Sequence, residues 1–282
     1  MPELPEVEIL ARHLQPLLRG KTISRVVVRR VKILKPTSLR EFQRVLTGAK
    51  FTSLSRRGKY LLFELRSKTS GKPVTLLGHL GMTGRMFVVK NNEPLPKHAA
   101  VIFDLGRRNF IYEDTRYFGR LTLDVSAVEK LGPEPLGNEF TPEIFIRALK
   151  RSRQAVKVKL LDQSLVAGVG NIYASEALFR ARISPKLAAK RLTIGQIKKL
   201  WRAIREVLGE AIAGGSTLPL NFSGGKSDGL FYFGRAPSQQ DYYEERLRVY
   251  DRAGKSCQDC GHPIKRIIQA ARSTFYCPQC QK

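Results

Sequence analysis

The four cysteines of this 282-residue chain are grouped near its C-terminal end, as Cys257-x2-Cys260 and Cys277-x2-Cys280. Two such pairs, 16 residues apart, can close a tetrahedral four-thiolate site around a zinc ion, with a short hairpin between the pairs. Four thiolates leave no open position for water or substrate, so the pattern predicts one structural zinc. Disulfides would be reduced in the cytosol, which also favours a metal site. Two redox-active Cys-x2-Cys motifs are the alternative.

The charge of the chain predicts a polyanionic partner. Lysine and arginine number 50 against 24 acidic residues, which gives a net charge of +26 and a pI near 10.3. The basic residues are spread along the whole chain, and no apolar run approaches the ~20 residues that span a bilayer. We therefore expect a cytoplasmic protein that binds the phosphate backbone of a nucleic acid and does not bind membranes.

Strand-like segments dominate the first half of the chain. Short apolar runs are separated by Gly, Pro and Asn clusters, so residues 20 to 130 predict a β-sandwich or barrel. The runs are Ile23–Val31, Tyr60–Leu65, Val74–Leu80, Met86–Val89, Val101–Leu105 and Phe110–Tyr112. A turn-rich stretch at Leu131–Gly137 then predicts a linker.

The second half predicts helices. Thr141 before Pro142 indicates a helix start, and that helix continues to Lys150. Further helices are expected at 158–165 and 172–181. Thr193-x2-Gln196 forms a capping-box pattern ahead of an apolar stripe from Ile197 to Ala211, which ends at Gly214-Gly215.

The N-terminus carries a candidate nucleophile. Removal of Met1 would leave Pro2 with a free secondary amine, which can attack a sugar aldehyde carbon and form an iminium. Leucines at helical spacing follow up to Gly20, so Glu3 and Glu6 are expected at or near a helix start. An ordinary Met-Pro terminus that caps a surface helix is the alternative.

A glycine-containing turn, Val166-Ala167-Gly168-Val169-Gly170-Asn171, comes directly before a predicted helix. Such a turn leaves backbone N–H groups free to bind a phosphate, and the Asn171 amide can add a contact. A tight connection between two helices is the alternative interpretation.

Taken together, these segments resemble bacterial formamidopyrimidine-DNA glycosylases. The resemblance rests on motifs in the family order, namely Met1–Glu8, Gly78–Gly84, Leu131–Leu136, Val166–Ala174 and the four-cysteine finger. It implies an α+β multidomain fold with an N-terminal β-sandwich, a nucleophile-bearing helix, a helix-two-turn-helix region and a zinc finger. It also implies a bifunctional base-excision enzyme that removes 8-oxoguanine and formamidopyrimidines and then cuts the strand by β,δ-elimination.

The resemblance assigns Pro2 as the nucleophile on C1′ and Glu3 as the acid/base. A base inside a duplex is out of reach, so the nucleotide must be flipped out. By resemblance, Met82, Arg116 and Phe118 fill the gap, although ordinary strand packing is the alternative for Met82 and Phe118. The family commonly has Asp-Pro-Arg-Arg-Phe-Gly where this chain has Asp114-Thr115-Arg116-Tyr117-Phe118-Gly119, which leaves the stiffness of the loop open.

Five further residues match family positions that contact DNA. By resemblance Lys59 lies near the lesion as part of the catalytic set, and Lys157 precedes the two-turn motif. The positions that grip phosphates are matched by His79, Asn171 and Arg272. Solvated lysines and a structural histidine are the alternatives.

The expected domains are residues 2–130 (β-sandwich), 131–217 (helix-two-turn-helix), 218–246 (an atypical segment that could cover the flipped base) and 247–282 (zinc finger). We expect a monomer on damaged double-stranded DNA, associated with the nucleoid. An endonuclease VIII-like glycosylase for oxidised pyrimidines is the nearest rival. A non-catalytic zinc-ribbon protein that binds nucleic acid is another, but it leaves Pro2 and Glu3 unexplained.

Overall fold

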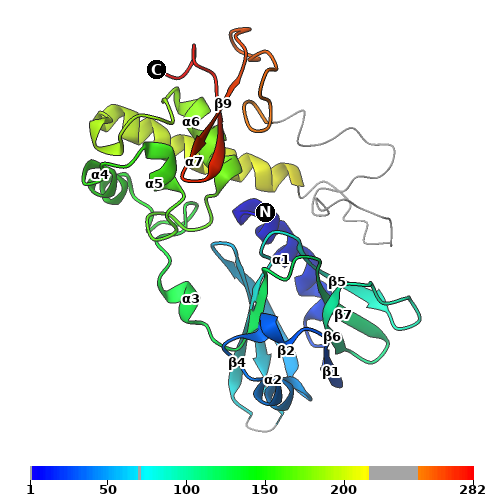
Figure 1. The fold of residues 1–282 in the computed structure, drawn as a ribbon. Coiled ribbons are helices and arrows are strands. Elements are labelled where there is room, and N and C mark those ends of the chain that lie inside the picture. The colour runs from blue at the N-terminus through cyan, green and yellow to red at the C-terminus, as the bar shows by residue number, and fades with distance from the viewer. Residues whose placement is uncertain (1, 69–70, 216–246) are drawn as a thin grey trace. The chain divides into compact units, whose positions relative to one another are not determined.

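Two four-stranded antiparallel sheets form the N-terminal part of the protein, in a computed structural model that describes residues 2–68, 71–215 and 247–282 (Figure 1). One sheet has the order β1 (Arg25–Val28), β6 (Ala99–Asp104), β7 (Arg108–Asp114), β5 (Gly84–Lys90). The other has the order β2 (Lys50–Arg57), β3 (Tyr60–Arg66), β4 (Pro73–His79), β8 (Arg120–Thr122). The predicted β-sandwich is confirmed.

Aromatic rings fill the space between the two sheets. Phe51 and Phe63 of one sheet lie 6.2 and 5.5 Å from Phe110 of the other, measured between ring centroids. Phe103 stacks on Phe110 at 5.4 Å, and all four rings are buried. Burial alternates along β3, which carries Phe63, whereas β6 and β7 are buried over several consecutive residues.

Short helices border the sandwich. They are α1 (Leu4–Leu18), the 3₁₀ turn η1 (Val31–Leu34), α2 (Leu39–Leu46) and α3 (Ser126–Glu129). The expected strand at 23–31 is shorter than predicted, since β1 ends at Val28 and the chain turns into η1, whose Ile33 and Leu34 are buried. Neither α2 nor β2 was expected from the sequence.

The C-terminal part is helical apart from one hairpin. Its elements are α4 (Pro142–Lys150), α5 (Val156–Leu160), α6 (Asn171–Ala181), η2 (Ala189–Arg191), α7 (Ile194–Gly215), β9 (Lys265–Gln269) and β10 (Arg272–Tyr276). Both predicted caps are present. Thr141 Oγ1 accepts from the Ile144 N–H at 3.3 Å, and Thr193 and Gln196 bond reciprocally at 3.1 and 2.8 Å.

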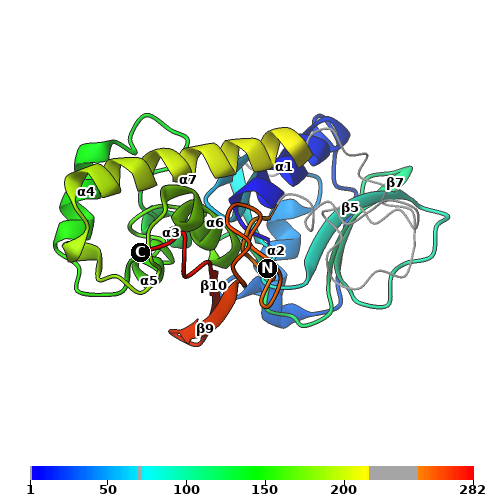
Figure 2. The same cartoon turned by 90° about the horizontal axis from the view of Figure 1, so that it is seen from above.

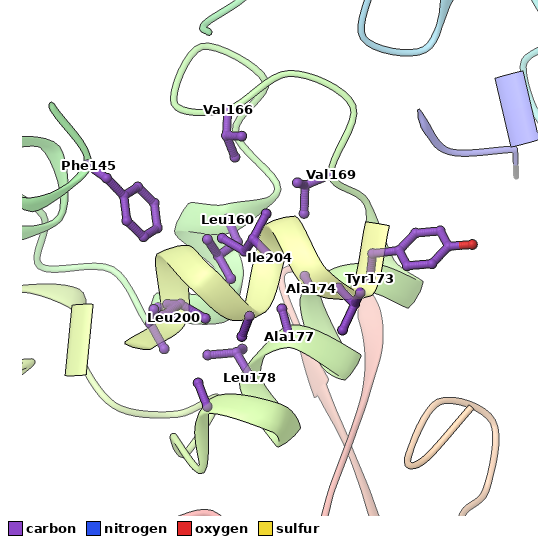
Figure 3. Packing of buried hydrophobic residues seen from close by; sticks show 14 of the residues in the cluster. Phe145, Leu160, Val166, Val169, Tyr173, Ala174, Ala177, Leu178, Leu200 and Ile204 are labelled. Carbon is purple, nitrogen blue, oxygen red and sulfur yellow. The ribbon is translucent and has the colours of Figure 1, made fainter. Parts of the chain in front are cut away.

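Helix α6 lies at the centre of this second core, alongside the long helix α7 (Figures 2 and 3). Ala174, Ala177 and Leu178 of α6 are fully buried in the cluster that also contains Leu200 and Ile204 of α7. The helix expected at 158–165 stops at Leu160.

The early end of α5 has a local cause. The Asp162 carboxylate accepts from the Ser164 N–H at 2.9 Å and so competes with the helical bonding pattern.

The contacts divide the described residues into two units, each with its own core. The first holds Pro2 and residues 6–129; the second holds 3–5, 130–215 and 247–282. The atypical segment predicted at 218–246 lies outside the described residues. Among the residues described, no helix has both the length and the hydropathy needed to cross a membrane.

Candidate functional site

Glu3 is held by the N-terminus of α6. Its carboxylate is 1 % exposed and accepts from the backbone N–H groups of Ile172 at 2.9 Å and Tyr173 at 3.4 Å. The residue before the helix is a glycine, so the capping oxygen comes from a residue 169 positions earlier in the chain. The sequence predicted Glu3 at or near the start of its own helix. Glu3 does lie directly before α1, but its carboxylate neutralises the positive N-terminal end of α6.

The turn before α6 fits closely around the N-terminal segment. The Leu4 N–H donates to the Gly168 carbonyl at 3.1 Å, and Leu4 is buried in the helical core. Gly168 has a φ of +83°, and a Cβ there would lie 2.7 Å from the Leu4 side chain. The glycine of this predicted phosphate-binding turn therefore has a second task, which is to seat Leu4 and orient Glu3.

Lys157, Asn171 and the finger hairpin form one polar cluster in the second unit. Lys157 Nζ donates to Asn171 Oδ1 and to the Ser273 carbonyl, while Asn171 Nδ2 donates to the same carbonyl at 2.9 Å. Burial and the charge of Arg272 lower the pKa of Lys157 to about 8, against the opposite effect of Glu3. Arg272 itself is exposed at the start of β10. Four residues that the sequence singled out therefore interact in this unit, namely Glu3, Lys157, Asn171 and Arg272.

In the first unit, Lys59 and His79 influence each other electrostatically. Lys59 follows the tight turn at Gly58 between β2 and β3 and is 8 % exposed. Burial, together with the charges of Lys59 and Arg120, lowers the pKa of His79 to about 4. His79 Nδ1 accepts from the Gly81 N–H at 3.1 Å, so the neutral ring carries its proton on Nε2 and can donate it to a ligand. Pro2 is half-buried in the same unit.

Met82, Arg116 and Phe118 come from two loops whose backbones touch. A Cβ on Gly81 would lie 2.6 Å from the Gly119 nitrogen and 2.7 Å from the Phe118 carbonyl carbon. Met82 is 42 % exposed and Phe118 58 %, and the Arg116 guanidinium lies 4.9 Å from the Phe118 ring centroid. Ordinary strand packing does not describe Met82 or Phe118, because both are large apolar side chains left in solvent.

Asp114 joins the two loops, a task that sequence reasoning missed. Its carboxylate is fully buried and accepts from Thr83 Oγ1 at 2.6 Å, the Arg116 N–H at 3.2 Å and the Gly119 N–H at 2.8 Å. An acidic residue at a strand end, directly before the Thr-Arg-Tyr-Phe-Gly segment, is the local signal for such a role.

Glu176, also unnoticed in the sequence, anchors the entry to the finger. Its carboxylate accepts from the N–H groups of Arg248, Val249 and Tyr250 at 2.9, 3.0 and 2.8 Å. Burial raises the pKa of Glu176, and the three backbone hydrogen bonds oppose that rise. Helix α6 thus binds the N-terminal segment at one end and the start of the finger along its side.

The four cysteines converge as their spacing predicts. Their sulfur atoms all lie within 4.8 Å of one another, with Cys257–Cys280 at 3.9 Å and Cys260–Cys277 at 3.4 Å. Tetrahedral bonds of about 2.3 Å to a zinc ion would separate neighbouring sulfurs by about 3.8 Å, so the cluster has the dimensions of a four-thiolate metal site. The strands β9 and β10 form the hairpin between the two pairs.

Three family models match the chain along its length. They are the formamidopyrimidine-DNA glycosylase N-terminal domain at residues 1–121, the formamidopyrimidine-DNA glycosylase H2TH domain at 131–221, and the zinc finger found in FPG and IleRS at 254–282. Together they match most of both described units and all four cysteines.

Relatives of known name match over their full length. The chain is 42 % identical over 282 residues to a formamidopyrimidine-DNA glycosylase of Carboxydothermus hydrogenoformans, with all of both chains covered. It is 43 % identical over 289 residues to that of Thermus thermophilus, covering all of this chain and 98 % of the relative.

Solved structures of Lactococcus lactis Fpg (MutM) also match. A complex of that protein with DNA containing N7-benzyl-Fapy-dG superposes with a TM-score of 0.86 at 32 % identity over the whole of both chains. A complex with DNA containing an abasic site gives 0.86 at 32 % identity over 99 % of each chain. With three matching domain models and full-length relatives above 40 % identity, the chain belongs to the formamidopyrimidine-DNA glycosylase family.

Proposed function

We propose that this protein excises oxidised purines, 8-oxoguanine and formamidopyrimidines, from double-stranded DNA and then cleaves the strand at the resulting abasic site. Family membership makes it a base-excision repair glycosylase with abasic-site lyase activity, and favours this function over a non-catalytic zinc-ribbon protein. The observation that carries the proposal is the buried Glu3 carboxylate, fixed on the N-terminus of α6 one residue after Pro2.

In this proposal the Pro2 nitrogen, freed by removal of Met1, attacks C1′ of the damaged nucleotide. The bond from C1′ to the base breaks and the base leaves with the electron pair. The Pro2 nitrogen loses its proton to the Glu3 carboxylate as the new bond forms. Glu3 then gives this proton to the ring oxygen, which opens the sugar and leaves an iminium between Pro2 and C1′. β-Elimination then expels the 3′ phosphate, δ-elimination expels the 5′ phosphate, and water releases Pro2.

Met82, Arg116 and Phe118 are proposed to occupy the space that the flipped nucleotide leaves. An exposed apolar side chain and an exposed aromatic ring can separate a base step, and the Arg116 guanidinium can donate to the unpaired cytosine. We call these three side chains the wedge. Asp114 and the glycines of the two loops hold its backbone, so in this proposal the wedge is formed before DNA binds.

Lys59 is proposed to act at the lesion, and four donors are proposed to hold the DNA around it. His79 would donate from Nε2 as a neutral ring, since its pKa lies near 4. Lys157, Asn171 and Arg272 would act from one cluster in the second unit, in which the Arg272 guanidinium is exposed and the Lys157 amine is buried behind it. These groups suit phosphate oxygens, which carry the non-specific part of the affinity.

Cys257, Cys260, Cys277 and Cys280 would hold one zinc ion. The donor set is four thiolates at compatible spacing, and such a set gives zinc a structural task that keeps the hairpin and Arg272 in place. The proposed domains keep the boundaries 2–130, 131–217, 218–246 and 247–282. The segment 218–246 as a cover for the flipped base stays a prediction, as do the monomeric state and the cytoplasmic, nucleoid-associated location.

Borohydride trapping tests the proposed function directly. Purified protein, shown by intact mass to lack Met1, is incubated with duplexes carrying 8-oxoguanine, a formamidopyrimidine, an oxidised pyrimidine or an abasic site. We expect a covalent complex and strand cleavage with both oxidised purines and with the abasic site. Pro2→Gly should weaken both signals, and protein that retains Met1 should be inactive. A preference for the oxidised pyrimidine would favour the endonuclease VIII-like function instead.

A further inference from the structure

In the loop from Asp114 to Gly119, Tyr117 differs from its neighbours in both exposure and backbone conformation. Its φ is +54°, in the left-handed region that non-glycine residues rarely occupy. Arg116 and Phe118 on either side are exposed, whereas Tyr117 is half-buried. The left-handed conformation of Tyr117 turns the chain. The guanidinium of Arg116, on one side of Tyr117, lies over the ring of Phe118 on the other side. The shape of the exposed pair therefore depends on an unusual conformation at residue 117.

Arg30 contacts Tyr117 from a separate and well-anchored part of the first unit. The Arg30 guanidinium carbon lies 4.8 Å from the centroid of the Tyr117 ring, in cation–π geometry. The backbone N–H groups of Arg29 and Arg30 donate to the Ala100 carbonyl of β6 at 2.8 and 3.3 Å. Arg30 directly precedes η1, in which Ile33 and Leu34 are buried. Its guanidinium is therefore carried by a fixed segment of backbone.

Asp114 fixes the ends of the same loop but bonds to neither residue 117 nor residue 118. Its carboxylate accepts from the N–H groups of Arg116 and Gly119, which bracket them. The contact between Arg30 and Tyr117 holds the middle of the loop. Tyr117 lies in the segment where the chain departs from the family motif, so this contact comes from another segment to the place where the two differ.

We propose that Arg30 and Tyr117 are a pair of positioning residues that hold Arg116 and Phe118 ready for insertion into the duplex. The proposal rests on the proposed function, in which Arg116 and Phe118 fill the gap. Without the pair, the loop reaches the insertion conformation only part of the time, and the step that extrudes a paired base becomes less favourable. Cleavage of an abasic site in single-stranded DNA needs no insertion and is left unchanged.

Kinetics on two substrates test the proposal with a double-mutant cycle. The variants are Arg30→Gln, Tyr117→Leu and both together, with Tyr117→Phe as the conservative change that keeps the ring face. Lys32→Gln removes one positive charge from the same exposed segment and serves as the matched control. On 8-oxoguanine opposite cytosine, each single change should lower kcat/KM roughly two- to fivefold, the range that an exposed cation–π contact supports. The double variant should lose no more than either single one.

The contact itself has a signature in the free protein. Ring currents from Tyr117 should shift the Arg30 Nε–H resonance in arginine-labelled protein. Tyr117→Phe should keep that shift and Tyr117→Leu should abolish it. Thermal unfolding of each variant checks that the sandwich is intact.

Three results would overturn the proposal. In the first, the losses of Arg30→Gln and Tyr117→Leu multiply, which means that Arg30 contacts DNA independently of the loop. In the second, Lys32→Gln is as harmful as Arg30→Gln, which means that charge alone matters. In the third, cleavage of the single-stranded abasic site falls in parallel with excision. A wild-type protein that leaves all damaged bases in place would instead refute the proposed function.

Discussion

Glu3 combines two tasks in one carboxylate. It caps α6 by accepting from the Ile172 and Tyr173 N–H groups, and it is the proposed proton donor to the sugar. A glutamine side chain largely separates the two tasks. Its one oxygen can still accept from the Ile172 N–H at 2.9 Å, the weaker bond from the Tyr173 N–H at 3.4 Å is lost, and no acidic proton remains.

Glu3→Gln should therefore lower the unfolding temperature only slightly, through the lost Tyr173 bond, and lower base excision by about 10²- to 10⁴-fold, the usual range for a general acid. Cleavage of a preformed abasic site should fall less. Single-turnover assays on 8-oxoguanine and abasic duplexes measure the two steps. Glu8→Gln, which removes a carboxylate from α1 that is paired with Arg12 and Arg56, is the control. Undiminished excision by the Glu3 variant would show that another group supplies the proton.

Lys157 gives the stability of the protein a pH dependence of known sign. Its pKa is lowered from 10.5 to about 8 in the folded protein. Between these two values the unfolded chain binds more protons than the folded one, so this residue makes stability rise with pH from about 8 to 10.5. Below about pH 8 the amine of Lys157 is charged while buried, which lowers the free energy of unfolding.

We expect the free energy of unfolding of the wild type, minus that of Lys157→Met, to grow by roughly 2 to 3 kcal/mol between pH 8 and pH 10.5. Urea denaturation of both proteins at four pH values measures it. Taking the difference removes the titration of groups that the two proteins share. A difference that stays flat over this range would mean that Lys157 titrates normally.

At the scale of elements, the turn before α6 tolerates no side chain at residue 168. Gly168→Ala forces a left-handed alanine and places a methyl group 2.7 Å from Leu4. We expect it to destabilise the protein by about 1 to 3 kcal/mol and to slow base excision, since the turn holds Leu4, which directly follows Glu3 in the chain. Gly209→Ala in α7 is the contrast. Its Cβ meets nothing within 4 Å, so it should stabilise by about 0.5 to 1 kcal/mol. Thermal unfolding and excision rates of both variants test these expectations, and a Gly168→Ala protein as stable and active as the wild type would contradict them.

The finger is proposed to depend on one bound zinc ion. Zinc analysis of active protein should give one ion per chain, and Cys277→Ser should lose it. Structural zinc contributes roughly 10 to 16 kcal/mol in finger peptides, far more than this small hairpin could supply by packing. DNA binding should weaken in the variant, while the unfolding of the sandwich keeps its midpoint. Active protein without zinc would refute the assignment.

Patterns repeated within one segment are what the sequence predicts well. The capping box and apolar stripe of α7 and the spacing of the cysteines are local, and the structure has both. Helix α2 was missed because only Phe42 and Leu46 of its eight residues are buried, and β2 because it is a mostly polar edge strand. Asp114 could not be recognised as a loop organiser, since its partner Thr83 lies 31 residues away.

At the scale of the whole molecule, a net charge of +26 predicts salt-dependent DNA binding. The logarithm of the affinity should fall linearly with the logarithm of salt concentration, by about 0.9 per phosphate neutralised. Arg272→Ala should reduce this slope by about one, whatever the sequence of the duplex. Lys198→Ala removes an exposed charge from α7 and should change the slope less. Fluorescence anisotropy between 50 and 200 mM salt, the range over which such affinities change most visibly, measures both. Equal slopes for Arg272→Ala and the wild type would remove Arg272 from the phosphate contacts.

The long separation between Glu3 and its partners also has a consequence for biosynthesis. Ile172 and Tyr173 follow Glu3 by 169 and 170 residues, so at about 5 to 20 residues per second the ribosome adds them roughly 10 to 30 s later. During that interval the partners of Glu3 and Leu4 in α6 and in the turn before it have not been synthesised. If Met1 is removed, as the proposed function requires, this interval lets an aminopeptidase act on the growing chain before α6 is made and Glu3 and Leu4 are buried.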